Sequence, residues 1–225
     1  MDKIVLTGNY QNCKIGNIIS ISEDRGRSVG YTGESLTLLA PKLSFLKIWH
    51  DNIGKISEEE NTKYYIEEFY KQVLKQLDPE EVALKLSYQP ILLCYENNKD
   101  FCHRHLVAFW LELFLGIKTY EVRVDEENKK LIILDRPTHL KEKMENIIKE
   151  NYNMSGFNSI RAAYLFNQAS ELERVYEEQA EEWMRLCGSV PSGDYPGTIM
   201  TEAAGLRVEA DEEEIRYIKQ KKLQR

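Results

Sequence analysis

The sequence lacks any apolar run approaching the ~20 residues that a membrane-spanning helix requires. Residues 1–6 form a strand-length run that soon reaches Gly8 and Asn9, so they do not resemble a signal peptide. There is no Cys-x-x-Cys pair and no spacing typical of a disulfide framework, which indicates free thiols in a reducing compartment. We therefore expect a cytoplasmic protein that does not enter the membrane. Its four cysteines are Cys13, Cys94, Cys102 and Cys187.

The chain also lacks an excess of positive charge, because its 30 lysines and arginines are outnumbered by 37 aspartates and glutamates, which gives a net charge of −7. This balance excludes a general attraction to nucleic acid or to anionic membranes. A local basic groove could still bind nucleic acid, so charge disfavours that partner without removing it. Hydrophobic residues make up 42% of the chain, which is enough to bury a core and excludes a disordered chain. No internal repeat occurs.

The first part of the chain alternates strand-like runs with helical patterns, and this alternation is typical of α/β domains. The strand at 120–124 is expected beside the strand at 91–93, through a helical crossover, with an antiparallel edge strand after it. We predict a mostly parallel sheet with flanking helices, Rossmann-like, over residues 1–136. The strand-like runs are 3–7, 15–21, 91–93, 120–124 and 131–134.

Residues 137–225 differ in character and are predicted to form a helical extension. Helical patterns cover 138–150 and 159–187, and Gly188 ends the second. Residues 189–205 are predicted to be a loop rich in proline and glycine, and a last helix begins near Asp211. These helices could engage a protein partner.

The most informative stretch runs from Pro90 to Leu115. A short apolar run, 91–93, is followed by a polar turn and then by an apolar helix from about His103, which Gly116 ends. Ligands of α/β proteins bind at such junctions, beyond the carboxyl end of a strand. The junction carries Cys94, Glu96, Cys102, His103 and Arg104, which we expect around a common, water-reachable hollow.

Three of these residues are catalytic candidates. Cys102 would start the helix, where free backbone N–H groups and the positive end of the helix dipole lower the pKa of a thiol. His103 beside it would act in the same direction, and Glu96 would serve as general base or as the group that orients it.

Arg104 is a candidate ligand-binding residue, because its planar guanidinium suits phosphate or carboxylate. Arg25 and Arg27 follow another strand end, in a loop that starts at Ser22, and could face the same crevice. Together with Cys94 these residues make up the predicted ligand-binding set. The alternatives are that Arg25 and Arg27 lie on an exposed, solvated loop and that Arg104 forms a buried ion pair with Glu96.

Two sharper templates fit less well. Cysteine phosphatases cradle phosphate in a tight loop, whereas nine residues separate Cys94 from Arg104 here and the loop contains no glycine. A structural zinc site would use Cys94, Cys102, His103 or the distant Cys13, but adjacent residues on a helix point in different directions. We therefore predict no metal, and we expect Cys94 to be a small buried residue of the core strand.

The paired motif, Leu92-Leu93-Cys94-Tyr95-Glu96 and Cys102-His103-Arg104-His105-Leu106, resembles the signature of the domain-of-unknown-function family 488 (DUF488). Residues 19–22, 39–41 and 77–81 of this chain are similar to further conserved segments of one branch of that family. The resemblance covers about residues 1–125 and implies a compact α/β domain with a shared pocket, but no reaction and no cofactor.

The favoured function is an enzyme that binds a phosphate-bearing ligand, an anionic small molecule such as a nucleotide or a nucleic-acid end, at this crevice. The alternative is a non-catalytic module that binds a ligand or a protein.

Overall fold

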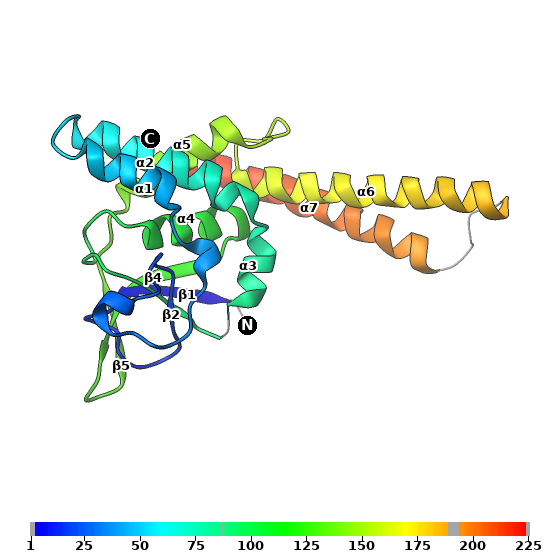
Figure 1. Cartoon of the computed structure of the whole chain (residues 1–225). Coiled ribbons are helices and arrows are strands. Elements are labelled where there is room, and N and C mark those ends of the chain that lie inside the picture. Colours follow the sequence, from blue (N-terminus) through cyan, green and yellow to red (C-terminus); the bar gives the residue numbers. More distant parts are fainter. Residues whose placement is uncertain (1–2, 87, 189–193, 224–225) are drawn as a thin grey trace. The chain divides into compact units, whose positions relative to one another are not determined.

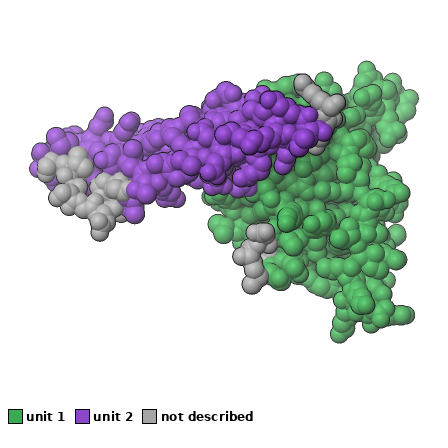
Figure 2. Space-filling model, turned by 180° about the vertical axis from the view of Figure 1, so that it is seen from behind, with its two compact units in different colours: residues 1–151 green, residues 152–225 purple. Residues whose placement is uncertain are grey.

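A computed structural model describes residues 3–86, 88–188 and 194–223. The chain divides into two compact units, Met1–Asn151 and Tyr152–Arg225, which are coloured separately in Figure 2. The sequence suggested a boundary after residue 136, whereas helix α5 (His139–Asn151) lies in the first unit, because it packs on helices α2 and α4. Among the described residues, no helix is long and apolar enough to cross a membrane.

The first unit contains a five-stranded sheet in the order β2-β3-β1-β4-β5. The first four of these strands are parallel, and β5 pairs antiparallel with β4 at one edge, as expected. This confirms the α/β fold with a mostly parallel sheet. The strands are β1 (Ile4–Asn9), β2 (Ile18–Ser20), β3 (Ile91–Cys94), β4 (Lys118–Asp125) and β5 (Lys130–Leu134).

The predicted position of β4 in the sheet is wrong. We placed β4 beside β3, but β1 lies between them and pairs with both. Helix α4, which connects β3 to β4, contacts all three strands and so carries the chain across β1. A crossover of this length can pass over one intervening strand as easily as it can join two neighbours.

Helices cover one face of the sheet, with α4 nearest to the strands (Figure 1). Sequence signals set several helix ends: Ser57 and Glu60 form the expected capping box, Asp78 caps the helix that Pro79 begins, and Gly116 ends α4 in a left-handed conformation. The helices of this unit are α1 (Leu43–Asn52), α2 (Glu58–Gln72), α3 (Pro79–Lys85), α4 (His103–Leu115) and α5, with short 3₁₀ turns at Arg27–Val29, Thr37–Leu39 and Leu74–Gln76.

Alternation along the strands sorts side chains between the two faces of the sheet. Leu6, Cys13, Leu93 and Val122 belong to a core cluster on one face, and Tyr31 packs against it. Residues one position away point to the other face, toward α4. That second face carries the polar groups of the candidate site.

The second unit is a pair of adjacent helices, α6 (Ile160–Cys187) and α7 (Asp194–Leu223), shown yellow-orange and orange-red in Figure 1. The loop predicted over 189–205 is wrong from Asp194 onward, where α7 already begins, and residues 189–193 lie outside the described part. Pro196 is compatible with the helix because it falls in the first turn, where backbone N–H groups have no partner within the helix. Gly205 sits inside α7.

Gly205→Ala is expected to stabilise α7 by ~0.5–1 kcal/mol, because alanine has the higher helix propensity. A Cβ at position 205 would meet no heavy atom within 4 Å. Hydrogen exchange of the α7 amides should slow accordingly. Gly188→Ala is the matched control and should speed exchange at the end of α6, since Gly188 has φ +71°. Faster exchange in the Gly205→Ala protein would contradict the prediction.

Candidate functional site

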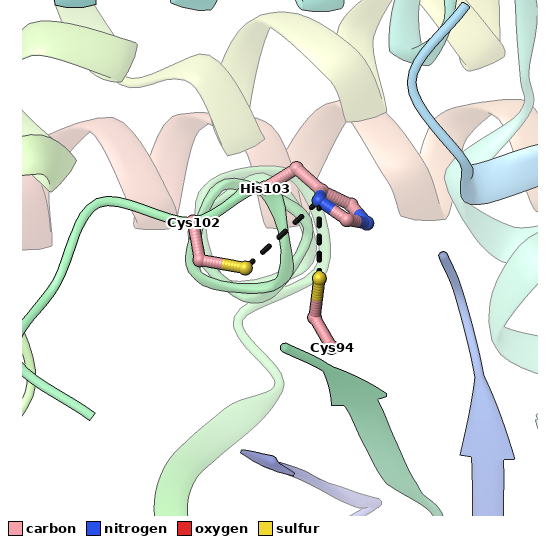
Figure 3. A group of neighbouring side chains, drawn as sticks. All are labelled: Cys94, Cys102 and His103. Carbon is pink, nitrogen blue, oxygen red and sulfur yellow. Dashed lines mark hydrogen bonds between the residues drawn. The ribbon is translucent and has the colours of Figure 1, made fainter. Parts of the chain in front are cut away.

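Three side chains of the central motif turn toward one another where β3 feeds α4 (Figure 3). Cys94 is the last residue of β3, Cys102 is the N-cap of α4 and His103 is its first residue. The Nδ1 atom of His103 lies 3.6 Å from the sulfur of Cys94 and 3.9 Å from that of Cys102. The other ring nitrogen, Nε2, lies 2.9 Å from the backbone oxygen of Ile21. Because this carbonyl can only accept, Nε2 carries a proton and Nδ1 is the atom that faces the thiols.

The sequence argument against a metal site depended on Cys102 and His103 pointing apart, and that premise is wrong. Cys102 precedes the helix and has an extended backbone, with φ −154° and ψ 144°, so its side chain does not follow the helical direction. Its sulfur, the sulfur of Cys94 and a ring nitrogen of His103 lie within 4.8 Å of one another, close enough for all three to donate to one metal ion. The prediction that the site holds no metal stays a prediction.

Arg104 belongs to a buried ion network on the same face of the sheet. Its side chain is 0% exposed, and its Nη2 atom lies 2.9 Å from Oε1 of Glu121 on β4. Nη2 also donates to the backbone oxygen of Asn97. Glu121 further accepts a hydrogen bond from Thr7 at 2.6 Å and lies 3.2 Å from Nε2 of His105. Glu121 therefore occupies the face of the guanidinium that we expected to bind a phosphate.

Glu121, Thr7 and His105 were missed by the sequence reasoning. A signal was present, because Glu121 stands between apolar neighbours in a run that alternates along β4. A carboxylate at an inward position of a central strand needs a buried cation. Burial alone would raise the pKa of Glu121, but the hydrogen bonds from His105 and Arg104 hold it below its usual value.

Glu96, in the turn after β3, completes a cluster of polar side chains with Cys94, Cys102, His103 and Arg104. Its Oε2 atom lies 3.9 Å from Nη1 of Arg104, and these two buried atoms have no hydrogen-bond partner. The expected pair of Glu96 and Arg104 is therefore an ion pair without a hydrogen bond. A group that can both accept and donate would satisfy the two atoms together, as a hydroxyl does.

The surroundings of the two thiols shift their pKa values in opposite directions. Burial alone would raise the pKa of Cys102, but the hydrogen bond from the Cys94 thiol and the positive charges of Arg104 and His103 place it well below its ordinary value. Burial raises the pKa of Cys94 well above that value, and its hydrogen bond with Cys102 acts in the same direction. Ionisation is therefore favoured at Cys102 and disfavoured at Cys94.

A negative charge on Cys102 also shifts the pKa values of His103 and Glu96. Burial would lower the pKa of His103, but the charge of Cys102 and the hydrogen bond between them raise it. Burial, followed by the Cys102 charge, raises the pKa of Glu96 to about 7. The arrangement therefore favours the thiolate of Cys102 and the imidazolium of His103, beside a Glu96 carboxyl group whose pKa is about 7.

Among the described residues, side chains cover Cys94, Cys102 and His103 where the sequence led us to expect a water-reachable hollow. Cys94 and Cys102 are each 2% exposed, and the ring of Phe69 packs against that of His103. Only Glu96 among the cluster members meets solvent appreciably, with its side chain 42% exposed. The sequence could not anticipate this cover, because Phe69 comes from α2, far from the motif in the chain.

Neither of two surface pockets formed by described residues is lined by Cys94, Cys102 or His103. One, of about 750 Å³, is lined by Lys99 and Phe101 of the turn together with His139 and Lys143 of α5. The other, of about 510 Å³, is lined by Arg25 together with residues of α1 and α2 and the segment around them.

The remaining predicted residues lie in the loop after β2. Ser22 is buried, and its hydroxyl bonds with Tyr10 and accepts from the backbone N–H of Gly26, so it holds the loop in shape. Arg25 and Arg27 are both exposed. No ion pair joins either arginine to the cluster among the described residues, and their place in ligand binding stays a prediction.

Comparison with protein-family models identifies a family for the first part of the chain. Residues 4–113 match the family model DUF488-N3a, described as the active DUF488-N3 subclade. No curated protein and no solved structure matches the chain. The matched segment contains β1 through most of α4, and with it both halves of the cysteine motif. The chain thus carries a domain of the DUF488 family, as its paired motif indicated.

Proposed function

We propose that the DUF488 domain is a cysteine-dependent enzyme in which Cys102 is the nucleophile. The observation that carries this proposal is the environment of the Cys102 sulfur, which lies at a helix N-terminus, beside His103 Nδ1 and close to the charge of Arg104. Such surroundings favour the thiolate, which is the reactive form of cysteine. The matching family model is described as that of an active subclade, which agrees with an enzymatic role.

In this mechanism the thiolate attacks an electrophilic carbon or phosphorus of the ligand. A bond forms from sulfur to that atom while the bond to the leaving group breaks, and Glu96 gives the leaving group a proton. Glu96 suits this role because its pKa is raised to about 7. Water then hydrolyses the covalent adduct with Glu96 as base, which restores both groups. His103 stabilises the thiolate from the other side.

The ligand proposed is phosphate-bearing. Its phosphate would meet Arg25 and Arg27, which Ser22 positions by holding the loop. A hydroxyl of the ligand would satisfy Arg104 Nη1 and Glu96 Oε2 together, since the two atoms lack hydrogen bonds and lie 3.9 Å apart. Access requires the turn over residues 96–101 to move, because the sulfur of Cys102 is covered.

The test measures alkylation of the full-length protein by iodoacetamide across pH, with peptide mass spectrometry to separate the cysteines. The alkylation rate of Cys102 is expected to reach half its maximum at a pH well below ~8.5, the ordinary value for a thiol. The sign follows from the lowered pKa of Cys102, which leaves the thiolate present as pH falls through neutrality. The midpoint of this profile reports ionisation even where burial slows the rate itself.

Cys13→Ser is the control, because Cys13 is equally buried but has a pKa raised to about 11. The substitution should leave the Cys102 profile unchanged. Ligand binding is tested separately by the melting shift that AMP or inorganic phosphate produces, which the Arg25→Ala/Arg27→Ala protein should lack. An ordinary midpoint for Cys102 would sink nucleophilic catalysis and leave the non-catalytic binding module as the better reading.

A further inference from the structure

The proposed mechanism uses one thiol, but the cluster contains two. Cys94 and Cys102 have their sulfur atoms within 4.8 Å of each other, and both face the same Nδ1 atom of His103 (Figure 3). In the nucleophilic mechanism above, Cys94 only donates a hydrogen bond to Cys102 and forms no covalent bond. A second thiol beside a thiolate is, however, what a reversible oxidation site requires.

We propose that Cys94 and Cys102 form a reversible disulfide when the protein meets a peroxide, with Cys102 as the oxidised thiol and Cys94 as the resolving thiol. The inference depends on the proposed function only in that both need a reactive Cys102. It requires no phosphate-bearing ligand and no turnover.

The chemistry balances in two steps, with hydrogen peroxide as the oxidant. The Cys102 thiolate attacks one peroxide oxygen, so that a sulfur–oxygen bond forms and the oxygen–oxygen bond breaks. The hydroxide that leaves takes the Nδ1 proton of His103 and becomes water. The products are a sulfenic acid on Cys102 and a neutral imidazole.

The second step uses the other thiol on the same imidazole. His103 Nδ1, 3.6 Å from the sulfur, accepts the Cys94 proton, and the new thiolate attacks the sulfur of Cys102. The disulfide bond forms, the sulfur–oxygen bond breaks, and the departing hydroxide regains the proton from Nδ1 to leave as water. Two electrons have passed from the sulfur pair to the peroxide, and a dithiol reductant returns them.

His103 is held in the orientation that both steps need. Its Nε2–H donates to the backbone oxygen of Ile21 at 2.9 Å, so proton exchange is confined to Nδ1. Cys102 can approach Cys94 by rotating its side chain, because its backbone is extended and lies before the first residue of α4. A disulfide of ~2.05 Å therefore forms from neighbouring sulfurs without unwinding the helix.

The other cysteines supply internal controls. Cys13 is as buried as the pair, but its sulfur donates to the backbone oxygen of Val122 on the opposite face of the sheet. Cys187 is exposed and belongs to the second unit. Neither is expected to join the disulfide.

The experiment treats the full-length protein with hydrogen peroxide, blocks free thiols with N-ethylmaleimide and maps peptides without reduction. We expect a cross-link between the peptides of Cys94 and Cys102, lighter by two hydrogen atoms than the two thiol peptides together and lost on treatment with dithiothreitol. Cys94→Ser should abolish the cross-link and raise the sulfenic acid of Cys102 that dimedone traps, at least several-fold. Cys13→Ser should behave as the unsubstituted protein.

Several outcomes overturn the inference. These are a free Cys94 thiol beside an oxidised Cys102, no oxidation of either residue, no rise in trapped sulfenic acid in Cys94→Ser, or a copurifying zinc ion that protects both thiols. A failed cross-link together with a low alkylation midpoint for Cys102 would leave the proposed enzyme standing. An ordinary alkylation midpoint for Cys102 together with the expected cross-link would leave the disulfide standing and contradict the proposed enzyme.

Discussion

Replacing Glu121 with glutamine is expected to destabilise the DUF488 domain by about 3 kcal/mol, the size typical of breaking a buried ion pair from one side. Arg104 has a side chain that is 0% exposed, and Glu121 is the carboxylate that hydrogen-bonds it. The glutamine variant leaves the arginine charge buried without that counter-charge. Its amide also places a donor where Thr7 and His105 now meet an acceptor.

The measurement is guanidinium unfolding followed by tryptophan fluorescence in a Trp183→Phe background, since Trp183 belongs to the second unit. The remaining tryptophans, Trp49 and Trp110, then report on the first unit alone. Glu67→Gln is the matched control. Glu67 also contacts two cations, Lys63 and Lys71, but at 3.8 and 3.9 Å, and its side chain is 29% exposed rather than buried. That control should cost no more than ~0.5 kcal/mol. Equal effects of the two substitutions would refute a special role for the buried network.

Much of this architecture could be predicted from local sequence. Capping residues fixed the starts of α2 and α3, and Gly116 and Gly188 fixed the ends of α4 and α6, because each supplies a hydrogen bond or a backbone conformation that acts within one turn. The motif around Cys94 and Cys102 was placed correctly for the same reason. A strand end and a helix start are local events.

What could not be predicted depends on residues far apart in the chain. The order of strands was wrong at β4, because sequence spacing does not say whether a crossover passes over a strand. The sequence predicted that Arg104 binds a ligand and offered an ion pair with Glu96, eight positions earlier, as the alternative, whereas Glu121 across the sheet is the closer carboxylate. The cover over His103 could not be predicted for the same reason, since Phe69 comes from α2, far from the motif in the chain.

The ion network links the stability of the domain to the chemistry proposed for it. Glu121 holds the Nε and Nη2 side of the guanidinium, and this leaves Nη1 directed at Glu96. The charge of Arg104 in turn contributes to the low pKa of Cys102. A buried network of this kind costs desolvation energy, and a functional role for its cation accounts for that cost better than stability does.

Arg104→Met is therefore expected to raise the midpoint of the Cys102 alkylation profile by at least about one pH unit and to slow alkylation at pH ~6 about tenfold, since a nearby cation shifts a pKa by ~1–3 units. The single variant leaves Glu121 buried without Arg104, so the decisive protein is Arg104→Met/Glu121→Leu, which removes both charges and should recover most of the lost stability. Arg136→Met is the control, because Arg136 also pairs with a carboxylate, Glu112 at 2.7 Å. A double variant that folds with an unchanged Cys102 midpoint would show that the guanidinium serves the fold and that the thiol gains its reactivity elsewhere.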